Sequence, residues 1–144
     1  MNFRELTEQS EIERVMFLFE EDIHNKMISR EQLSILAKKF SENAIFLLME
    51  VDNESVGFCS FYANDHLSKR AFISMIIIGG KYQRRGYGRN IMLEVENKAK
   101  ERGMCTIRAE VALTNEKSKC FFESQGFEKS VILKKSIFFE KTLM

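Results

Sequence analysis

The residues best suited to chemistry lie at positions 79–89, where glycines and cationic side chains occur close together. The segment reads Gly79-Gly80-Lys81-Tyr82-Gln83-Arg84-Arg85-Gly86-Tyr87-Gly88-Arg89. It follows an apolar run at residues 72–78 and precedes a helical pattern from about residue 89 to 102. Gly86 and Gly88 have no Cβ atom, so an anionic group can come close to the main chain. Because backbone amides are free where a helix begins, we expect this turn to bind a pyrophosphate.

Two glycines in a turn are a weak signal when they are taken alone. No Gly-Lys-Ser/Thr follows, which excludes the phosphate-binding lysine loop, and the three glycines of the dinucleotide fingerprint are also missing. The alternative is a plain strand-to-helix turn with a solvated basic rim. This stretch alone does not decide between the two interpretations.

Composition places the chain among ordinary globular proteins. Its 144 residues are 44% hydrophobic and 30% charged, which predicts one domain that spans residues 1–144. The formal net charge is +1, so no overall field favours nucleic acid or an anionic membrane. Aromatic and cationic side chains alternate at residues 81–89, but without a second basic stripe we expect no nucleic-acid partner.

Cysteine and histidine positions give no sign of a disulfide framework or a metal site. Cys59, Cys105 and Cys120 show no paired spacing, which indicates reduced thiols in a cytoplasmic protein. His24 and His66 lie far apart in the sequence, so we expect no metal. The amino-terminal residues lack the apolar core of a signal peptide, and no apolar run approaches the roughly 20 residues that span a bilayer. We therefore expect no membrane partner.

Hydrophobic periodicity predicts alternating strands and helices. We expect strands at residues 3–6, 44–51, 56–63, 69–78, 105–113, 127–133 and 136–143, and four helices that begin near residues 10, 29, 89 and 115. The first helix should continue to Ile23, and Ser29 with Gln32 fits a capping box at the start of the second. The aliphatic run at 75–78 predicts a strand that is covered on both faces. This order of elements predicts an α/β (α+β) fold.

Two segments resemble motifs of the GCN5-related N-acetyltransferase (GNAT) superfamily. Gln83-Arg84-Arg85-Gly86-Tyr87-Gly88 resembles the Gln/Arg-x-x-Gly-x-Gly/Ala motif, and residues 115–127 resemble the Asn-x-x-Ala-x-x-x-Tyr-x-x-x-Gly-Phe segment. With the order of elements, the resemblance covers nearly the full chain. It implies a mixed, strongly twisted central sheet of about six to seven strands flanked by four helices. Two parallel central strands would splay apart to admit the pantetheine arm of acetyl-CoA.

The resemblance implies a set of residues that bind acetyl-CoA as a cosubstrate. The turn would hold the pyrophosphate through Gln83, Arg84, Arg85, Gly86, Tyr87, Gly88 and Arg89. Ile76-Ile77-Ile78 stands where the family has Leu-Ala-Val, so the Ile76 amide would face the thioester carbonyl and Ile78 would pair with the pantetheine. Core packing is the alternative for these side chains, and both roles can hold because the proposed one uses only the backbone. Asn115 would also hold the pantetheine, and Phe122 belongs to the same set of cofactor-binding residues.

Glu110 is the candidate general base, because the attacking amine must lose a proton. Glu110-Val111 with Asn115 matches the Glu-Val-x-x-x-Asn pattern of ribosomal-protein N-terminal acetyltransferases, in which the glutamate is the base. Period-two alternation at residues 105–113 places Glu110 on the mostly polar face of its strand. The alternative is a surface ion pair with Arg108.

Phe122 departs from the family pattern, because the family has at this position a tyrosine that donates a proton to the leaving thiolate. Either the thiolate leaves unassisted, or Tyr87 or water donates the proton, or activity is low. A packing explanation also exists. With Gly126 at C′ of the helix, Phe127 would contact Phe122 as in a Schellman ending.

The resemblance implies an N-acetyltransferase that transfers an acetyl group from acetyl-CoA to a primary amine by direct attack in a ternary complex. The alternative is a non-catalytic acyl-CoA-binding or regulatory module on the same fold, supported only by the missing tyrosine. We expect the acceptor to be a small-molecule or protein amine, and the chain to be a monomer or a homodimer. Turns that carry His24, Asp65 and His66 could contribute to the acceptor site, although solvated turn residues are the more common case.

Overall fold

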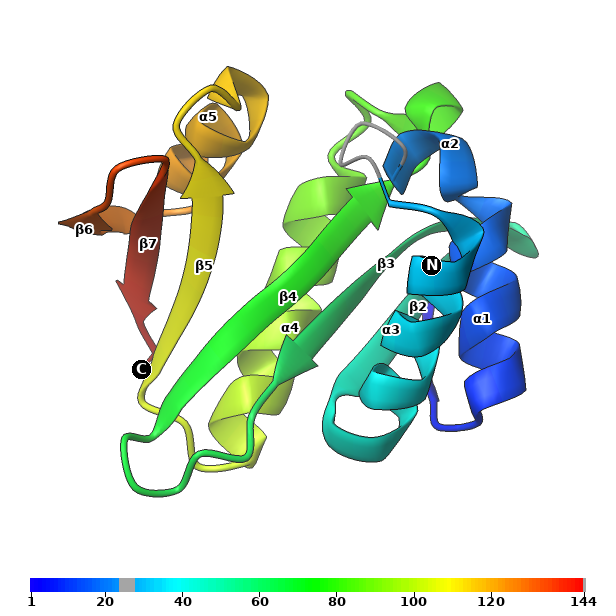
Figure 1. Cartoon of the computed structure of the whole chain (residues 1–144), viewed down its shortest axis with the longest axis horizontal. Coiled ribbons are helices and arrows are strands. Elements are labelled where there is room, and N and C mark those ends of the chain that lie inside the picture. Colours follow the sequence, from blue (N-terminus) through cyan, green and yellow to red (C-terminus); the bar gives the residue numbers. More distant parts are fainter. Residues whose placement is uncertain (24–27, 144) are drawn as a thin grey trace.

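A computed structural model describes residues 1–23 and 28–143, which form a seven-stranded sheet with helices on both faces (Figure 1). The strands are β1 (Asn2–Leu6), β2 (Ile45–Val51), β3 (Glu54–Tyr62), β4 (Arg70–Ile78), β5 (Thr106–Ala112), β6 (Glu128–Ile132) and β7 (Ser136–Thr142). The helices are α1 (Gln9–Leu18), α2 (Glu20–Ile23), α3 (Arg30–Asn43), α4 (Tyr87–Glu101) and α5 (Glu116–Ser124), with a short 3₁₀ helix η2 (Gly80–Tyr82). The order β1-β2-β3-β4-β5-β7-β6, with β4 and β5 parallel, confirms the predicted mixed α/β fold.

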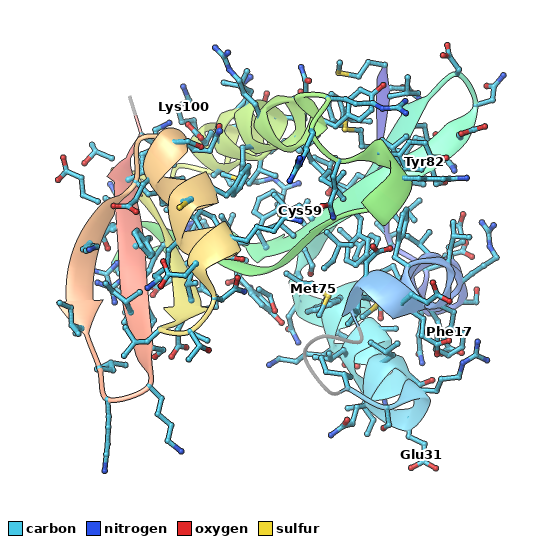
Figure 2. The ribbon with its side chains drawn as sticks, turned by 90° about the horizontal axis from the view of Figure 1, so that it is seen from above. Phe17, Glu31, Cys59, Met75, Tyr82 and Lys100 are labelled. Atoms are coloured by element: carbon cyan, nitrogen blue, oxygen red, sulfur yellow. The ribbon has the colours of Figure 1, made fainter. Side chains whose placement is uncertain are left out.

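Two apolar cores lie on opposite faces of the sheet. Apolar residues of α1 and α3 pack on one face of β2 to β4, and those of α4 pack on the other face, in a core that Phe122 of α5 extends to Phe139 of β7. Figure 1 shows α3 in front of the strands and α4 behind them. Met75 belongs to the first core and Cys59 to the second, on opposite sides of the sheet in the view from above (Figure 2). Each face of the central strands is therefore covered by different helices.

The parallel strands β4 and β5 pair only at their first residues. Arg70 to Ile73 pair with Thr106 to Ala109, and no pair joins the later residues of the two strands. β4 nevertheless continues to Ile78 and β5 to Ala112, and the two strands diverge toward these ends (Figure 1). The splayed pair implied by the family resemblance is confirmed.

A β-bulge in β4 changes which side chains face each core. Phe61 of β3 pairs with Ile73 and Ser60 pairs with Met75, so Ser74 is an extra residue in β4. Because a bulge shifts the alternation by one residue, Met75 and Ile77 are buried on the α1 and α3 side. Ile76 turns to the α4 side and is only half-buried. The prediction that residues 75–78 are covered on both faces is therefore confirmed, although Ile76 and Ile78 are only half-buried where they pack against the core that contains α4.

The ends of the helices follow the sequence signals with one exception. Ser29 and Gln32 form the predicted capping box at the start of α3. The predicted helix from residue 10 to 23 is instead two helices, because the chain leaves helical geometry at Phe19 (φ −103°, ψ 20°). This break accounts for the five α-helices among the described residues, where four were expected. A polar link was expected after Ile23, beginning at His24. Its residues 24–27 lie outside the described part of the chain.

The carboxyl end of α5 forms the predicted Schellman ending. The Phe127 amide donates to the Phe122 carbonyl at 3.0 Å, and the Gly126 amide donates to the Glu123 carbonyl at 3.1 Å. Gly126 has a φ of +89°, which glycine adopts without a steric penalty. The rings of Phe122 and Phe127 contact each other edge to face at 5.1 Å between centroids. This ending stabilises the carboxyl end of α5.

Candidate active site

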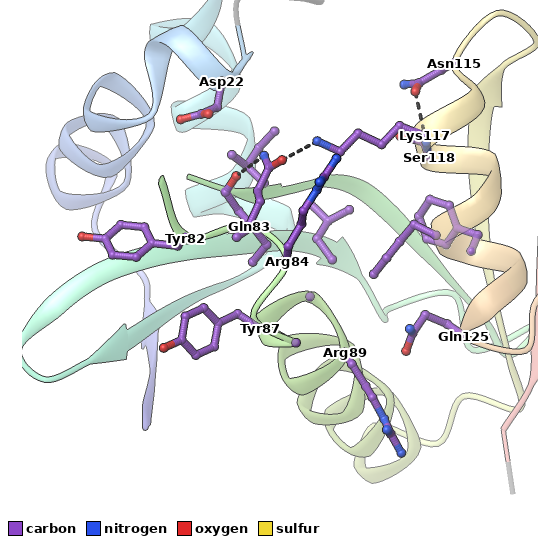
Figure 3. A pocket seen from close by; sticks show the side chains of 17 residues that line it. Asp22, Tyr82, Gln83, Arg84, Tyr87, Arg89, Asn115, Lys117, Ser118 and Gln125 are labelled. Atoms are coloured by element: carbon purple, nitrogen blue, oxygen red, sulfur yellow. Dashed lines mark hydrogen bonds between the residues drawn. The ribbon is translucent and has the colours of Figure 1, made fainter. Parts of the chain in front are cut away.

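A pocket of about 480 Å³ lies between the diverging end of β4, the turn that follows it, and α5 (Figure 3). Ten of the predicted cofactor residues line it, namely Ile76, Ile77, Ile78, Gln83, Arg84, Gly86, Tyr87, Gly88, Arg89 and Asn115. Phe122 lines it as well, whereas Arg85 and Glu110 do not. Residues that lie far apart in the sequence thus meet where β4 and β5 have separated.

The start of α4 presents main-chain amides to this pocket without a side-chain cap. Gly86 occupies the N-cap position with a φ of +83°, and the first intrahelical bond runs from the Asn90 amide to its carbonyl at 3.2 Å. In α3 and α5, by contrast, Ser29 and Asn115 cap the helix with their side chains. An uncapped helix start at a pocket wall is suited to bind an anion.

Gly88 is required by helix packing as well as by access to the main chain. A Cβ atom at this position would lie 2.9 Å from Cε1 of Phe121 on α5, closer than real Cβ contacts. Gly86 differs, because a Cβ atom there would have no heavy atom within 4 Å. The two positions therefore require glycine for different physical reasons. Gly86 supplies a left-handed backbone, and Gly88 allows α4 and α5 to approach each other.

Three cationic side chains line the pocket, from both of its walls. Arg84 and Arg89 come from the turn and the start of α4, and Lys117 comes from the first turn of α5. None of the three forms an ion pair within residues 1–23 and 28–143. Arg84 also has a φ of +66°, which is uncommon for a residue with a side chain. Asp22 also lines the pocket, so the described lining residues carry a net positive charge.

The backbone of Ile76 and Ile78 forms no strand pair on the side that β5 has left. The Gly79 amide donates to the Val56 carbonyl of β3 at 2.9 Å, so these two residues form a hydrogen-bonded pair. Bonded and non-bonded pairs alternate along antiparallel strands, and Ile78 and Ile76 fall at the non-bonded positions. Their amides and carbonyls therefore point away from β3 and toward the opening.

The side chain of Gln83 links the turn to both walls of the pocket. Its Nε2 donates to the Ile78 carbonyl at 2.9 Å, and its Oε1 accepts from the Nζ of Lys117. Sequence reasoning placed Gln83 in the motif but missed Lys117, Ser118, Phe121 and Gln125, which also line the pocket. The spacing of these residues along one face of α5, counted from Asn115, is the signal that could have found them.

Asp22 and Tyr82 form the far side of the pocket, and the sequence did not indicate either. Oδ1 of Asp22 accepts from the Gly80 amide at 2.9 Å, which joins α2 to the turn after β4. The Tyr82 hydroxyl donates to Oε2 of Glu54 at 2.5 Å, and this carboxylate raises the pKa of Tyr82 above its ordinary value. Both contacts hold η2 in place.

Asn115 and Phe122 are tied into the structure of α5. Oδ1 of Asn115 accepts from the Ser118 amide at 3.1 Å, so its carbonyl oxygen serves as the helix cap. Phe122 is only 4% exposed, and its ring stacks on Phe139 at 6.2 Å between centroids. The ring therefore belongs to the core and reaches the pocket from beneath.

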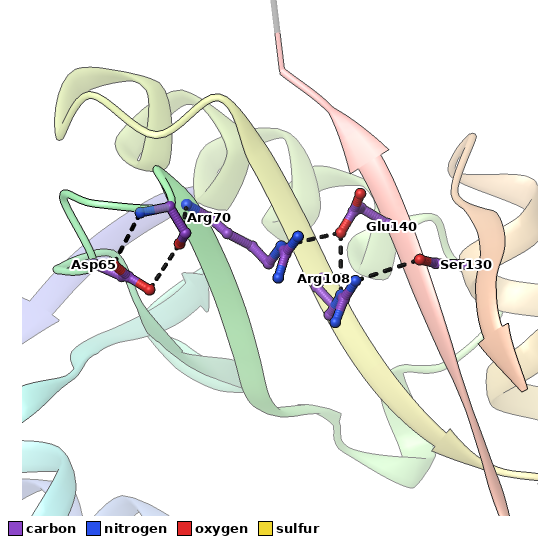
Figure 4. Close-up of polar contacts among 6 residues, drawn as sticks. Asp65, Arg70, Arg108, Ser130 and Glu140 are labelled. Atoms are coloured by element: carbon purple, nitrogen blue, oxygen red, sulfur yellow. Dashed lines mark hydrogen bonds and ion pairs between the residues drawn. The ribbon is translucent and has the colours of Figure 1, made fainter. Parts of the chain in front are cut away.

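Glu110 lies on β5 immediately after the last pair with β4, outside the pocket. Its Oε2 accepts from the Ser136 hydroxyl at 2.6 Å. The alternative prediction, an ion pair with Arg108, is wrong, because Arg108 bonds to Glu140 at 3.1 Å and to Ser130 at 3.3 Å (Figure 4). The side chain of Glu110 faces away from the core that contains α4, since Ala109 and Val111 point into that core.

Asp65 is a turn residue at the opposite end of β4. Its carboxylate accepts from the Leu67 and Ser68 amides at 3.2 and 3.1 Å, and from the Ser68 hydroxyl at 2.7 Å. These bonds lower the pKa of Asp65, and the Ser68 hydroxyl has the largest effect. Asp65 and His66 precede β4, whereas the pocket lies at its end, so neither residue lines the pocket.

Comparison with known proteins agrees with this geometry. The family model described as the acetyltransferase (GNAT) family matches residues 7–127. The chain therefore belongs to the GNAT acetyltransferase family. A sequence search of curated proteins finds no significant match. None of the described helices has the length and apolar character needed to cross a membrane.

Solved structures with low sequence identity share the fold over the whole chain. The PaiA N-acetyltransferase of Thermoplasma acidophilum in complex with coenzyme A has a TM-score of 0.77 at 17% identity, covering 99% of each chain. The ribosomal-protein-S18-alanine N-acetyltransferase of Escherichia coli has a TM-score of 0.78 at 16% identity, covering 99% of this chain and 94% of that one. An aminoglycoside 6′-N-acetyltransferase complexed with coenzyme A has a TM-score of 0.80 at 13% identity, covering 100% and 98%.

Proposed function

We propose that the protein is an N-acetyltransferase that transfers an acetyl group from acetyl-CoA to a primary amine. The observation that carries this proposal is the continuous pocket from the uncapped start of α4 to the unpaired backbone of Ile76 and Ile78. Membership in the acetyltransferase family and the coenzyme A complexes of two structural neighbours support it. The neighbours named for a ribosomal protein and an aminoglycoside support an amine acceptor.

The residues that line the pocket fit the chemical groups of acetyl-CoA. Its phosphates would bind at the amides of residues 88 and 89, where the positive end of α4 adds to the charge of Arg84 and Arg89. Its pantetheine arm, which carries amide groups, would pair with the backbone of Ile78 along the edge of β4. The Ile76 amide would donate to the thioester carbonyl as negative charge develops on that oxygen.

The reaction needs a proton acceptor on the side from which the amine approaches. The amine nitrogen bonds to the carbonyl carbon, the carbon–sulfur bond breaks, and the sulfur leaves as a thiolate. The acceptor amine is mostly protonated at neutral pH if its pKa resembles that of lysine, near 10.4. We propose Glu110 as the group that takes this proton, directly or through a water molecule, because it lies on β5 at the start of the opening.

Ligand-dependent stability tests the cofactor part of this proposal. A ligand that binds only the native state raises its free energy of unfolding, by about 2.7 kcal/mol at a concentration of 100 Kd. We expect acetyl-CoA in excess to raise the Tm, with calorimetry as an independent measurement of binding. No rise in Tm together with no calorimetric binding would refute the proposed cosubstrate. Screening an amine library with acetyl-CoA and a thiol reagent would then identify the acceptor class.

The phenylalanine at position 122 supports a second candidate, a non-catalytic acyl-CoA-binding module. Phe122 has no hydroxyl to protonate the thiolate, and its ring is held in the core by Phe127 and Phe139. A thiol pKa near 8.5 nevertheless makes a thiolate a tolerable leaving group. Binding of acetyl-CoA without release of thiol in the presence of any amine would favour the non-catalytic module.

The variant Phe122→Tyr measures how far the absence of a hydroxyl at position 122 lowers kcat. We expect acetyl-CoA affinity to stay within a few-fold, because the change adds one atom at the edge of the pocket. If the hydroxyl reaches the sulfur, kcat should rise by up to ~100-fold, the low end for general acid–base catalysis. The rate of thiol release under single-turnover conditions reports the chemical step, and it should be measured for Phe122→Tyr and for the unmutated protein. An unchanged rate of that step would show that position 122 serves packing only.

A further inference from the structure

Lys117 reaches across the opening between the two walls of the pocket. It lies in the first turn of α5, and its Nζ donates to Oε1 of Gln83 in the turn after β4. Figure 3 shows the extended lysine side chain approaching Gln83 from the α5 side. Gln83 follows β4 in the chain and Lys117 follows β5. The hydrogen bond between their side chains therefore connects the two strands at the end where they no longer pair with each other.

Gln83 positions the ammonium group without neutralising it. Its Nε2 is fixed on the carbonyl of Ile78 at 2.9 Å, which directs its Oε1 toward Lys117. Lys117 forms no ion pair with the carboxylates of the described chain. Lys119, two residues later, does pair with Glu116 at 2.8 Å. Lys117 therefore brings to the pocket an amino group that pairs with no carboxylate of the described residues.

A second cation lies beside the same point. Arg84 follows Gln83 directly, lines the pocket with Lys117, and is also without an ion pair among the described residues. The carboxylate of the pocket, Asp22, is engaged with the Gly80 amide on the far side. Like charges gathered in one place repel each other, and a bound anion removes that repulsion.

We propose that Lys117 binds a phosphate group of coenzyme A, from the wall opposite the main-chain amides of α4. This inference rests on the proposed use of acetyl-CoA and adds a binding residue that lies outside the turn at 83–89. The phosphates would then be held from both walls, by Arg84 and the start of α4 on one side and by α5 on the other. Because β4 and β5 pair over only four residues each, a bound phosphate would also join the two walls of the opening.

Lys117→Ala is the test, with Lys119→Ala as the matched control on the same helix. A hydrogen bond to a charged group contributes enough that we expect Lys117→Ala to weaken coenzyme A binding by about tenfold. Lys119→Ala removes the same charge from outside the pocket and should change the affinity by less than about twofold. Lys117→Arg keeps the charge and should retain affinity within a few-fold. Calorimetry in low salt gives the Kd, and added salt should reduce the difference between the two alanine variants.

Shortened ligands identify the group that Lys117 contacts. An equal loss with coenzyme A and dephospho-coenzyme A places the contact at the diphosphate, and a loss confined to coenzyme A places it at the 3′-phosphate. Pantetheine has no phosphate, so its affinity should be the same for Lys117→Ala and the unmutated protein. An equal loss with pantetheine, or no loss with coenzyme A, would overturn the inference. If the unmutated protein fails to bind coenzyme A, the proposed function itself fails, which is a different result.

Discussion

Replacement of Glu110 by glutamine is expected to lower kcat by ~10²–10⁴-fold at pH 7, the range for loss of a general base. Glutamine has nearly the same shape as glutamate but cannot accept the proton of the acceptor amine. Binding of acetyl-CoA should be unchanged, because Glu110 lies outside the pocket that holds the proposed cofactor residues. The decline in rate toward acidic pH should also become shallower. Steady-state kinetics across a range of pH, with the acceptor found by screening, measures both effects.

The position of Glu110 gives a reason to expect this loss. Ala109 is the last residue of β5 that pairs with β4, so Glu110 stands where the two strands begin to separate. Its side chain faces away from α4 and α5, which contribute to the two walls of the cofactor pocket. In a ternary complex the amine would reach the thioester from this other face. A base on that face can take the proton without entering the cofactor pocket.

Ser136→Ala separates a catalytic role of Glu110 from a structural one. The hydroxyl of Ser136 donates to Oε2 of Glu110 at 2.6 Å, so the alanine variant removes this bond and keeps the carboxylate. We expect it to change kcat by less than about tenfold, since the base remains. If Glu110→Gln keeps near-normal turnover and an unchanged pH profile, Glu110 is only the partner of Ser136. The proton then goes to another group or to water.

The parts of the fold that the sequence predicted are those governed by local signals. Gly103 ends α4 with a φ of +84°, and Asn115 caps α5, because each residue type has a specific effect on the backbone. The contact between Phe122 and Phe127 follows from the geometry of a glycine-terminated helix and was predicted for that reason. The pocket residues of the turn were likewise found from a short motif in which spacing is fixed.

The parts that could not be predicted depend on the register between distant strands. The extra residue Ser74 is visible only when β3 is paired with β4, and it decides that Ile76 faces the opening. The partners of Arg108 and Glu110 were missed because Glu140 and Ser136 come from β7, 32 and 26 residues later in the chain. Sequence neighbours on one strand face suggested an ion pair, but strands that pair later supplied better partners for both side chains.

Replacement of both Gly86 and Gly88 by valine is expected to abolish the rise in Tm that acetyl-CoA produces. At Gly86 a side chain is strained by the φ of +83°, so the N-cap geometry that exposes the helix amides should change. At Gly88 the new Cβ would meet Phe121 at 2.9 Å, which forces the start of α4 away from α5. Both changes displace amides that must converge on the phosphates. A ligand concentration of 100 Kd, which stabilises the unmutated protein by about 2.7 kcal/mol, should then give no measurable shift.

Gly103→Val is the matched control for the strained backbone. Gly103 has a φ of +84°, and a Cβ atom there would also have no heavy atom within 4 Å, as at Gly86. It lies at the opposite end of α4, so Gly103→Val should lose about as much stability as Gly86→Val, of the order of 1–2 kcal/mol, yet keep the full response to acetyl-CoA. A difference in the response to acetyl-CoA between Gly86→Val and Gly103→Val cannot come from backbone strain alone, because both variants are strained. The double variant then shows the additional effect of replacing Gly88. A double variant that has native circular dichroism and still responds fully to acetyl-CoA would show that the cofactor does not use the start of α4.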